Sequence, residues 1–439
     1  MDILIQILQL LACLSLLVIV HEFGHFITAK IFGVRVEKFY LFFNPGFTLF
    51  KFKPKNSDTE YGIGWLPLGG YVKLAGMIDE SMDTEHLKHE PQPWEFRSKP
   101  AWQRLIIMSA GVIMNLIAAM VIYSMMLYHY GEQYVKLQDA YMGMDFSEVA
   151  KEQGFRDGDI LLSADGEALE SFDETDIRKV LNASQVKVLR DGKEKTLVMT
   201  RTFMQDLAGS RQGFASFRYP FIVQEVMDGS AAGKAGLAAG DSLVSINGTT
   251  YPAWSDFAPQ LSLHRNDSIN VGFYRNGVYG EAMMYLDSTA KMGVWVRPYT
   301  EIYPVTHKEY GFWESFPAGI KKGAEMFAGY GSDFKIVFTK EGMESLGGFG
   351  SITSLFPDTF YWGVFWYLTA YLSVILAFMN LLPIPGLDGG HIIFLLYEMI
   401  TRRKLSQKFM IRMQQIGLFI LLFLMLYANG MDIFRALQP

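Results

Sequence analysis

Cysteine is almost absent from this chain of 439 residues, which has only Cys13. A single cysteine forms no disulfide within the chain and cannot build a zinc site from thiolates. An excess of positive charge is missing too, because 39 Lys and Arg stand against 45 Asp and Glu and the net charge is −6. Without a basic footprint for phosphates, we expect no nucleic-acid partner.

Lys and Arg are missing from four long apolar segments, residues 3–20, 105–130, 360–387 and 413–430. About 20 apolar residues in a helix span the hydrocarbon core of a bilayer. We therefore predict a polytopic α-helical membrane protein with about four transmembrane helices and soluble insertions. The first segment lacks a basic n-region and a cleavage site, so we expect a retained helix rather than a signal peptide.

Basic residues gather in two connections beside these spans. They are Arg35, Lys38, Lys51, Lys53, Lys55, Lys73, Lys88, Arg97 and Lys99 after the first span, and Arg402, Arg403, Lys404 and Lys408 before the fourth. The positive-inside rule puts both connections in the cytoplasm. Both termini and the middle region, residues 131–361, are then expected on the outer side, which in a bacterium is the periplasm.

His21, Glu22 and His25 form an HExxH sequence at the inner end of the first span. Ionisable side chains at bilayer depth are costly and usually mark a functional site. Histidines four residues apart share a helix face, so both can bind one Zn²⁺ while Glu22 reaches the water at the metal. A chance match is the alternative, and the position within a membrane segment disfavours it. The pattern predicts a zinc peptidase site toward the cytoplasmic side.

Asp388 is the candidate for a third metal ligand, because zinc needs three protein ligands at a catalytic site. It follows residues 380–387, where two prolines and a glycine interrupt the third span. Irregular backbone at this depth is tolerated only where it lines a cavity or is buried in protein. The alternative for Asp388 is a helix cap, and His391 is a poorer ligand candidate.

The middle region contains an internal repeat. Residues 158–166 and 240–248 share the pattern G-D-x-(L/I)-x-x-x-(N/D)-G at an offset of 82 (240 − 158). Each copy continues into alternating strand-like runs with a hairpin signal, Asp191-Gly192 in one and Asn276-Gly277 in the other. Two small β-rich modules are therefore expected.

Two further segments are informative. Apolar and charged residues alternate between residues 311 and 338, which predicts one or two amphipathic helices near the outer-side surface of the membrane, or a packing face against the modules.

Residues 61–72 are uncharged, too short to span the membrane, and contain Gly69-Gly70. They predict a re-entrant β-hairpin, with a cytoplasmic loop as the alternative.

These features divide the chain into five parts. Residues 1–130 hold the first two spans and the hairpin, 131–215 and 216–300 the two modules, 301–359 the amphipathic segment, and 360–439 the last two spans.

HExxH combined with N-x-x-P-x-P-x-L-D-G-G at residues 380–390 resembles the site-2 proteases, which are M50-type intramembrane zinc metalloproteases. PLGGYVK at 67–73, Trp102-Gln103-Arg104 leading to Gly111 and Asn115, and the repeat, which resembles paired PDZ domains, are similar to the regulator of sigma-E protease group. The first PDZ-like copy departs from the family in residues 147–155. Gly111-Val112 and Gly348-Phe349 also depart, since the family commonly has Gly-Pro at both places.

The resemblance implies a zinc endopeptidase of the bacterial inner membrane. His21, His25 and Asp388 would be the zinc ligands, Glu22 the general base, and Asn380 a residue that contacts substrate backbone. The hairpin residues Gly69, Gly70, Tyr71 and Val72 would bind substrate by strand addition.

The implied substrates are single-span membrane proteins such as an anti-sigma factor, and remnant signal peptides. The PDZ-like pair would capture peptides or act as a steric screen. Two other classes of protein are the alternatives. A PDZ-bearing scaffold with a decayed site would not need Glu22 or Asp388, and a transporter would show paired interrupted spans, which this sequence lacks.

Overall fold

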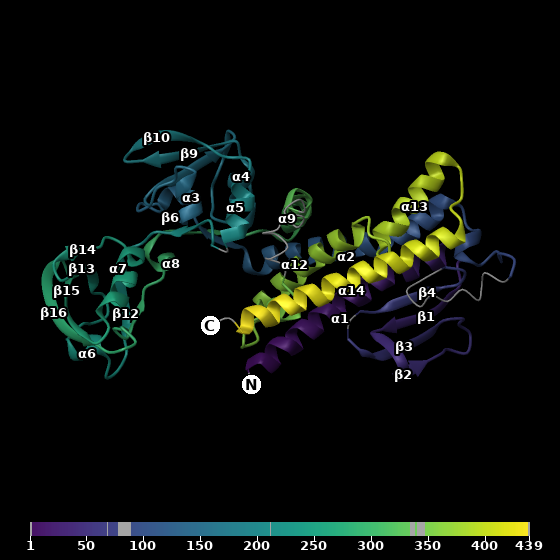
Figure 1. Ribbon diagram of the computed structural model, residues 1–439, viewed down its shortest axis with the longest axis horizontal. Helices are drawn as coiled ribbons and strands as arrows, with labels where there is room; N and C mark the ends of the chain where they lie inside the picture. The colour runs from purple at the N-terminus through teal and green to yellow at the C-terminus, as the bar shows by residue number, and fades with distance from the viewer. Residues whose placement is uncertain are drawn as a thin grey trace. The chain divides into compact units, whose positions relative to one another are not determined.

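The computed structural model describes residues 2–67, 69–77, 89–210, 212–333, 339 and 347–437. Contacts divide the chain into two compact units (Figure 1). The membrane unit consists of Met1–Gly131 and Glu309–Pro439, and the insert unit is Glu132–Lys308.

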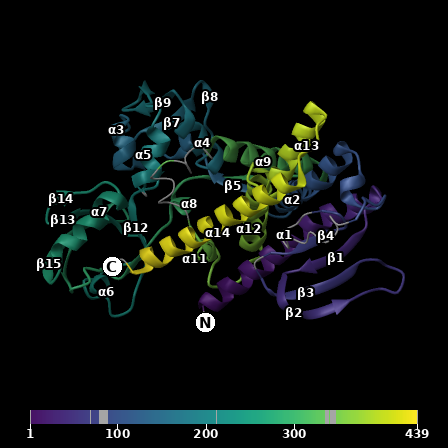
Figure 2. The same cartoon turned by 45° about the vertical axis from the view of Figure 1, so that its right-hand side comes forward.

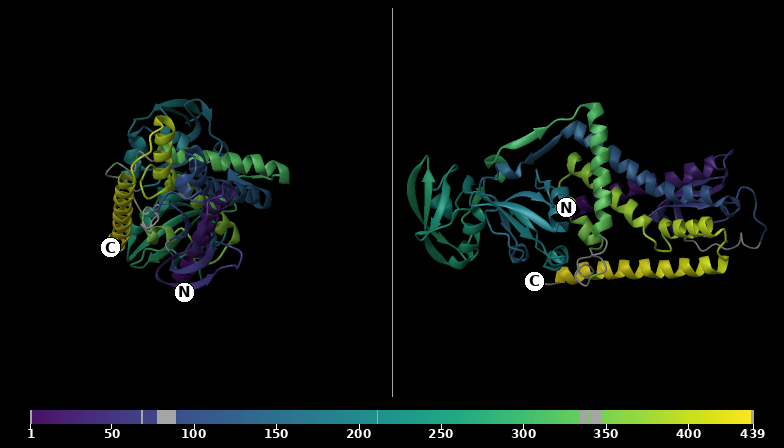
Figure 3. Two further views of the ribbon diagram at one scale, coloured as in Figure 1. Left: turned by 90° about the vertical axis from the view of Figure 1, so that its right-hand side faces the viewer. Right: turned by 90° about the horizontal axis from the view of Figure 1, so that it is seen from above.

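Within the described residues, four helices of the membrane unit are long and apolar enough to cross a membrane. They are α1 (Asp2–Ile31), α2 (Ala101–Tyr130), α12 (Trp362–Leu381) and α14 (Gln407–Leu437). They match the four predicted spans, but the third ends at Leu381 because the following prolines lack the N–H that a helix needs. The central helix is α2, which packs against α1, α12 and the shorter α13 (Asp388–Thr401). Figure 3 shows α14 along one edge of this unit.

The amphipathic segment forms one described helix, α9 (Phe312–Asp333), and its apolar face packs on α2 and α12. Met326 and Phe327 join a core with Tyr123 and Val374. Small residues such as Gly319 allow α9 to approach the α2 backbone at Ser124. Phe334 and Phe338, also expected in this helix, lie outside the described residues. Two short helices, η2 (Phe96–Ser98) and α11 (Phe349–Thr353), complete the unit's described helices.

A four-stranded sheet occupies the connection between α1 and α2. Its strands are β1 (Val36–Leu41), β2 (Phe43–Phe52), β3 (Glu60–Leu66) and β4 (Tyr71–Leu74), in the order β2-β3-β1-β4. Figure 2 shows it beside α1, which contacts β1 and β4. A hairpin over residues 61–72 is not what forms, because β1 lies between β3 and β4 and pairs with both. With Val36 and Tyr40 buried, β1 satisfies both of its edges at the centre of the sheet.

The insert unit contains the two expected β-rich modules. The first has η3 (Leu137–Asp139), β6 (Met144–Phe146), α3 (Glu148–Glu152), β7 (Ile160–Ala164), β8 (Glu167–Ala168), α4 (Glu174–Asn182), β9 (Gln185–Arg190), β10 (Lys193–Val198), α5 (Phe203–Ser210) and β11 (Ala215–Phe217). Its sheets are β10-β9-β7-β8 and β11-β6.

The second module has β12 (Phe221–Val226), α6 (Ala231–Lys234), β13 (Ser242–Ile246), β14 (Thr249–Thr250), α7 (Trp254–Leu261), η4 (Ser262–His264), β15 (Asp267–Arg275), β16 (Val278–Leu286) and β17 (Val294–Val296). Its main sheet has the order β16-β15-β13-β12-β17. Each module encloses its own apolar core.

The repeat is reproduced in three dimensions by an ion pair in each module that joins an arginine to a buried aspartate. Asp159 receives two hydrogen bonds from Arg190, at 2.7 and 2.6 Å. In the second module Asp241 receives two from Arg275, at 2.7 and 2.8 Å. Both aspartates are almost fully buried, so each needs such a partner. The ion pair explains why an aspartate stands in the G-D sequence of both repeats.

The insert unit ends past the boundary predicted at residue 300. After α8 (Tyr299–Ile302), the buried Tyr303 enters the core of the first module, and β18 (Val305–Lys308) pairs antiparallel with β5 (Glu132–Val135). The two ends of the insert therefore form one two-stranded ribbon. The boundary at 300 was misplaced because this pairing joins residues far apart in sequence.

Candidate metal centre

The two histidines of HExxH lie one turn apart on α1 and face the same cavity. Their Nε2 atoms are 3.3 Å apart, and the rings meet edge to face. This arrangement follows from the helix alone, since residues four apart share a face. Both rings are largely buried.

Asp388 begins α13 and brings its carboxylate to these rings. Its Oδ2 atom lies 3.2 Å from Nε2 of His21 and 3.2 Å from Nε2 of His25. The N-cap position of α13 is occupied by Leu387 and Asp388 is the first residue of the helix, so the capping alternative is not observed. The following Gly389 allows this turn, because a Cβ there would lie 2.1 Å from the Leu382 carbonyl oxygen.

The three atoms fit a tetrahedral cation. Ligands about 2.0–2.2 Å from zinc at tetrahedral angles are about 3.3–3.6 Å from one another, close to the separations found. Two neutral imidazoles and a carboxylate are a ligand set of catalytic zinc sites, which keep a fourth position open. Within the described residues, Oδ2 of Asp388 is also buried without a hydrogen-bond partner, as expected of an atom that awaits a metal. His391 is not part of this cluster.

The second ring nitrogen of His25 is held by the backbone of α2. Nδ1 lies 2.8 Å from the carbonyl oxygen of Ile107, which only accepts hydrogen bonds. Nδ1 must therefore carry the proton and donate, and Nε2 is left with its lone pair toward the other ligand atoms. The backbone thus selects the tautomer that binds a metal.

Gly111 allows α2 to approach the rings. A Cβ at this position would lie 2.4 Å from Nε2 of His25 and 2.6 Å from Cε1 of His21. Real Cβ atoms do not come this close, so a larger residue would displace at least one ring.

A cavity of about 960 Å³ surrounds the cluster. Glu22 lines it beside the histidines, as does Asn380, whose Nδ2 is 3.5 Å from Nε2 of His21. Glu22 is the only carboxylate besides Asp388 among the residues that line this cavity. The arrangement therefore offers a base and an amide beside the metal ligands.

The four residues expected to bind substrate line the same cavity. Gly69, Gly70, Tyr71 and Val72 lead into and form β4, the edge strand of the sheet. The Val72 amide interacts with the Glu22 carboxylate. The strand that was predicted to matter is thus at the site, although it belongs to a larger sheet than predicted.

Two polar residues that line the cavity were not singled out from the sequence. Asn44 accepts a hydrogen bond from the Tyr71 hydroxyl at 3.0 Å, and Gln414 is a buried amide of α14. Gln414 had a signal, because a polar side chain within a span usually has a partner or a function. Asn44 could not be identified from the sequence, since nothing local relates it to Tyr71.

Apolar helices that enclose a two-histidine, one-carboxylate site with an adjacent glutamate define a class, the membrane-embedded metalloproteases. The family model described as Peptidase family M50 matches residues 9–424. The chain belongs to this family and is a zinc metalloprotease.

Relatives agree over nearly their whole length. The chain is 30% identical to "Protease RseP" of Yersinia pestis, over 97% of both chains. It is 28% identical to "Regulator of sigma E protease" of Haemophilus influenzae, over 96% of this chain and 97% of the relative. A relative from Vibrio cholerae, 28% identical over 93% of both chains, is named as a zinc metalloprotease. The family resemblance of the sequence is confirmed.

Proposed function

We propose that this chain cuts transmembrane segments of single-span proteins within the bilayer, at a zinc site made by His21, His25 and Asp388. The observation that carries the proposal is the convergence of their three ligand atoms to within 3.3 Å of one another. A bound zinc ion supplies Lewis acidity, which polarises a peptide carbonyl and lowers the pKa of a water molecule toward neutrality.

Glu22 and Asn380 perform the remaining steps. Glu22 takes the proton from the attacking water and passes it to the leaving amine, as a general base that then acts as an acid. Asn380, whose Nδ2 lies 3.5 Å from Nε2 of His21, donates its amide to the substrate backbone. An amide donor there also supports the developing oxyanion.

The substrate reaches these groups as an extended strand. A helical segment cannot be cut while its amides are bonded within the helix, so it must unwind and find new partners. β4 is an edge strand that lines the cavity, and a strand edge provides such partners. We assign substrate binding to Gly69, Gly70, Tyr71 and Val72 on this basis.

The sheet itself enters the inner side of the bilayer, as a re-entrant element. Its strands β2 and β3 expose large apolar side chains, which include Phe47, Leu49, Phe50, Phe52 and Trp65. Exposed apolar side chains of this size and number are costly in water and suit lipid. The basic residues of the same connection, such as Lys51 and Lys53, are suited to anionic headgroups.

The topology follows from the basic connections. The sheet faces the cytoplasm, and the insert unit and both termini face the periplasm of a bacterial inner membrane. The metal site then lies toward the cytoplasmic side, at the inner end of α1.

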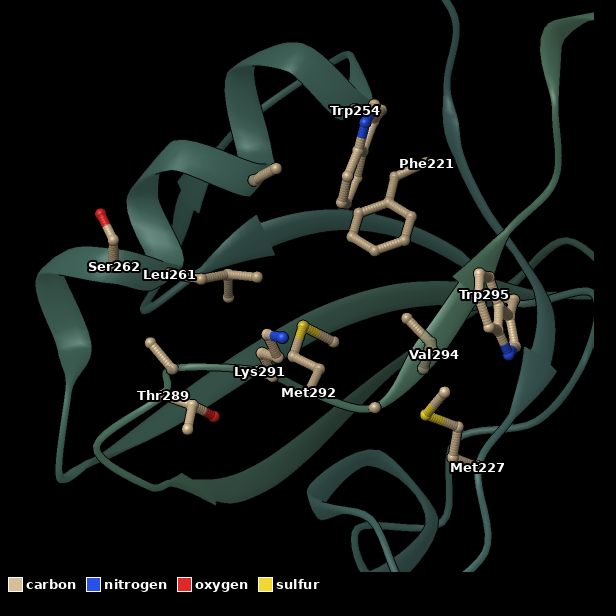
Figure 4. A pocket seen from close by; sticks show the side chains of 13 residues that line it. Phe221, Met227, Trp254, Leu261, Ser262, Thr289, Lys291, Met292, Val294 and Trp295 are labelled. Atoms are coloured by element: carbon tan, nitrogen blue, oxygen red, sulfur yellow. The ribbon is translucent and has the colours of Figure 1, made fainter. Parts of the chain in front are cut away.

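The second module carries a groove that suits a peptide. A pocket of about 360 Å³ lies between α7, with Trp254 and Leu261, and the segment that leads into β17, with Lys291 and Met292 (Figure 4). β17 ends its sheet, so an extended peptide can add beside it as in PDZ domains. Apolar walls select an apolar peptide side chain, and Lys291 favours a carboxylate.

The first module differs in the segment after its β9–β10 hairpin. An additional helix, α5, follows β10 there and packs against α3 and α4, with Phe203 and Leu207 buried in the core. We infer that the first module acts as a steric screen and the second also captures peptide.

The site and the names of the relatives together support a proposal for the substrate class. A relative named as a regulator of sigma E protease suggests an anti-sigma factor that another protease has first shortened, and remnant signal peptides fit the same requirement for a short outer part. The insert unit would exclude substrates whose outer domain is intact.

The test is Glu22→Gln in the full-length protein with a membrane-embedded reporter. Loss of the base should lower cleavage about 10²–10⁴-fold while one zinc per chain remains bound. Glu325→Gln, on an exposed face of α9, is the matched control and should cleave normally. Undiminished cleavage by Glu22→Gln would end the proposed mechanism.

A further inference from the structure

Asn115 is a buried amide on α2 that the steps above do not use. Its side chain is 1% exposed, and within the described residues its Oδ1 atom has no hydrogen-bond partner. Its backbone oxygen is satisfied by the hydroxyl of Ser373, at 2.7 Å. A buried carbonyl oxygen without a donor costs about 1–3 kcal/mol, so this oxygen calls for an explanation.

The explanation lies in the neighbouring ring of His21. Nδ2 of Asn115 is 3.4 Å from Nδ1 of His21. If Nε2 of His21 binds a metal, Nδ1 carries the proton, and two N–H groups would face each other. Turning the amide by 180° exchanges Oδ1 and Nδ2 in the same volume. Oδ1 then accepts from Nδ1–H, which satisfies the orphaned oxygen and removes the conflict.

The same face of α2 serves the other histidine. Ile107 accepts from Nδ1 of His25 through its carbonyl oxygen, Gly111 leaves space for both rings, and Asn115 reaches His21. These three positions recur every four residues and so share a helix face. His21 and His25 are also four apart on α1, in the opposite order, as an antiparallel helix pair requires.

We propose that Asn115 is a positioning residue whose side-chain oxygen accepts a hydrogen bond from Nδ1–H of His21. It thereby holds the ring orientation and tautomer that direct Nε2 toward the zinc site. Ligating histidines are usually held in this way, and loss of the partner typically costs 10- to 100-fold in metal affinity. The inference rests on the proposed function in taking His21 as a ligand.

The test compares zinc binding by full-length, detergent-purified variants. Asn115→Leu keeps the volume and removes the acceptor, and its apparent zinc dissociation constant, measured by chelator competition, should rise about 10- to 100-fold. Asn115→Asp restores an acceptor oxygen and should recover most of this loss. The visible absorption of Co²⁺ bound in place of zinc should change in Asn115→Leu and return toward the parent in Asn115→Asp.

The matched control is Ser124→Ala, which removes another buried polar group of α2 that contacts no histidine and should leave both readouts unchanged. Zinc affinity and Co²⁺ absorption in Asn115→Leu equal to those of the parent would overturn the positioning role, as would equal losses in Ser124→Ala. Failure of the proposed function has a different signature, because the parent would then bind zinc no more tightly than a His21→Ala variant.

Discussion

At the scale of single residues, the centre depends on what surrounds the ligands as much as on the ligands. Two imidazoles and a carboxylate meet because α1 and α13 carry them. The neighbouring helix α2 fixes the positions of the two imidazole rings. Gly111 provides the space beside the rings, and the Ile107 carbonyl sets the tautomer of His25. This is the usual division of work in metal sites, where outer contacts orient inner ligands.

Gly111→Ala tests this directly. The added Cβ would lie 2.4 Å from Nε2 of His25, so the ring must move and zinc affinity should fall at least about tenfold. Zinc content by mass spectrometry, after dialysis against a weak chelator, measures the change. Gly331→Ala adds the same group to a helical position with no neighbour within 4 Å and should keep full zinc. Full zinc in Gly111→Ala would contradict the close approach of α2.

The residues of the site divide into those that local sequence predicts and those that it does not. His21, Glu22 and His25 are predictable because helix geometry alone places them together. Asp388 is predictable because it follows an interrupted span, and irregular backbone at this depth is expected to line a cavity or to be buried in protein. Asn44 is not, since a separate element brings it to the cavity, and Gln414 is marked in the sequence only as a polar side chain within a span. No periodicity in the chain encodes which elements meet.

At the scale of elements, the duplicated modules show how a short motif maintains a fold. Each repeat buries an aspartate and joins it to an arginine on a neighbouring strand. The turns after β7 and β13 use Asp165 and Asn247 in the left-handed region, with φ of 47° and 49°, which these residue types tolerate. Local patterns such as these were predictable, whereas the order of strands β1 to β4 was not, because β1 pairs with strands from distant parts of the connection.

The ion pair in the second module makes its stability depend on pH. Burial raises the pKa of Asp241, but the hydrogen bonds from Arg275 and from the Ala238 amide, together with the charge of Arg275, outweigh burial, so the pKa lies below its ordinary value. A carboxyl with a lower pKa in the folded state stabilises the fold while it is ionised. This contribution is fully present above the unfolded pKa, about 4, and is lost as the pH falls through the folded pKa.

We therefore expect the free energy of unfolding of the Glu132–Lys308 fragment to fall when the pH is lowered below about 4. Asp241→Asn should be less stable than the parent at pH 7 and should lose less on acidification. Denaturant titrations followed by circular dichroism between pH 2 and 7, about the range that matters, measure both. The exposed Asp228→Asn is the control, and identical acid profiles for the two variants would refute the assignment.

At the scale of the whole molecule, the chain combines a catalytic membrane unit with an insert whose two ends pair with each other. The β5–β18 ribbon joins residues 132–135 to 305–308. The first and last residues of the insert therefore lie side by side. The sequence predicted both units from hydropathy and repeat. It did not predict the ribbon, because two four-residue strands separated by the whole insert have no local signal.

Deleting Glu132–Lys308 tests the role of the insert. If it excludes substrates with intact outer domains, the shortened enzyme should cut intact and trimmed reporters at similar rates, whereas the parent should cut mainly the trimmed one. Cleavage in cells that lack other proteases for the reporter, followed by gel mobility, gives the ratio. An unchanged preference for the trimmed reporter would refute the filter.

The central claim is that His21, His25 and Asp388 bind one zinc ion together. X-ray absorption at the zinc edge of the purified full-length protein measures it most directly. The account predicts one zinc per chain with two imidazole ligands and oxygen ligands at about 2.0–2.2 Å, and Asp388→Asn should change the oxygen shell and lower zinc occupancy. A spectrum without imidazole scattering, or one that Asp388→Asn leaves unaltered at full occupancy, would contradict it.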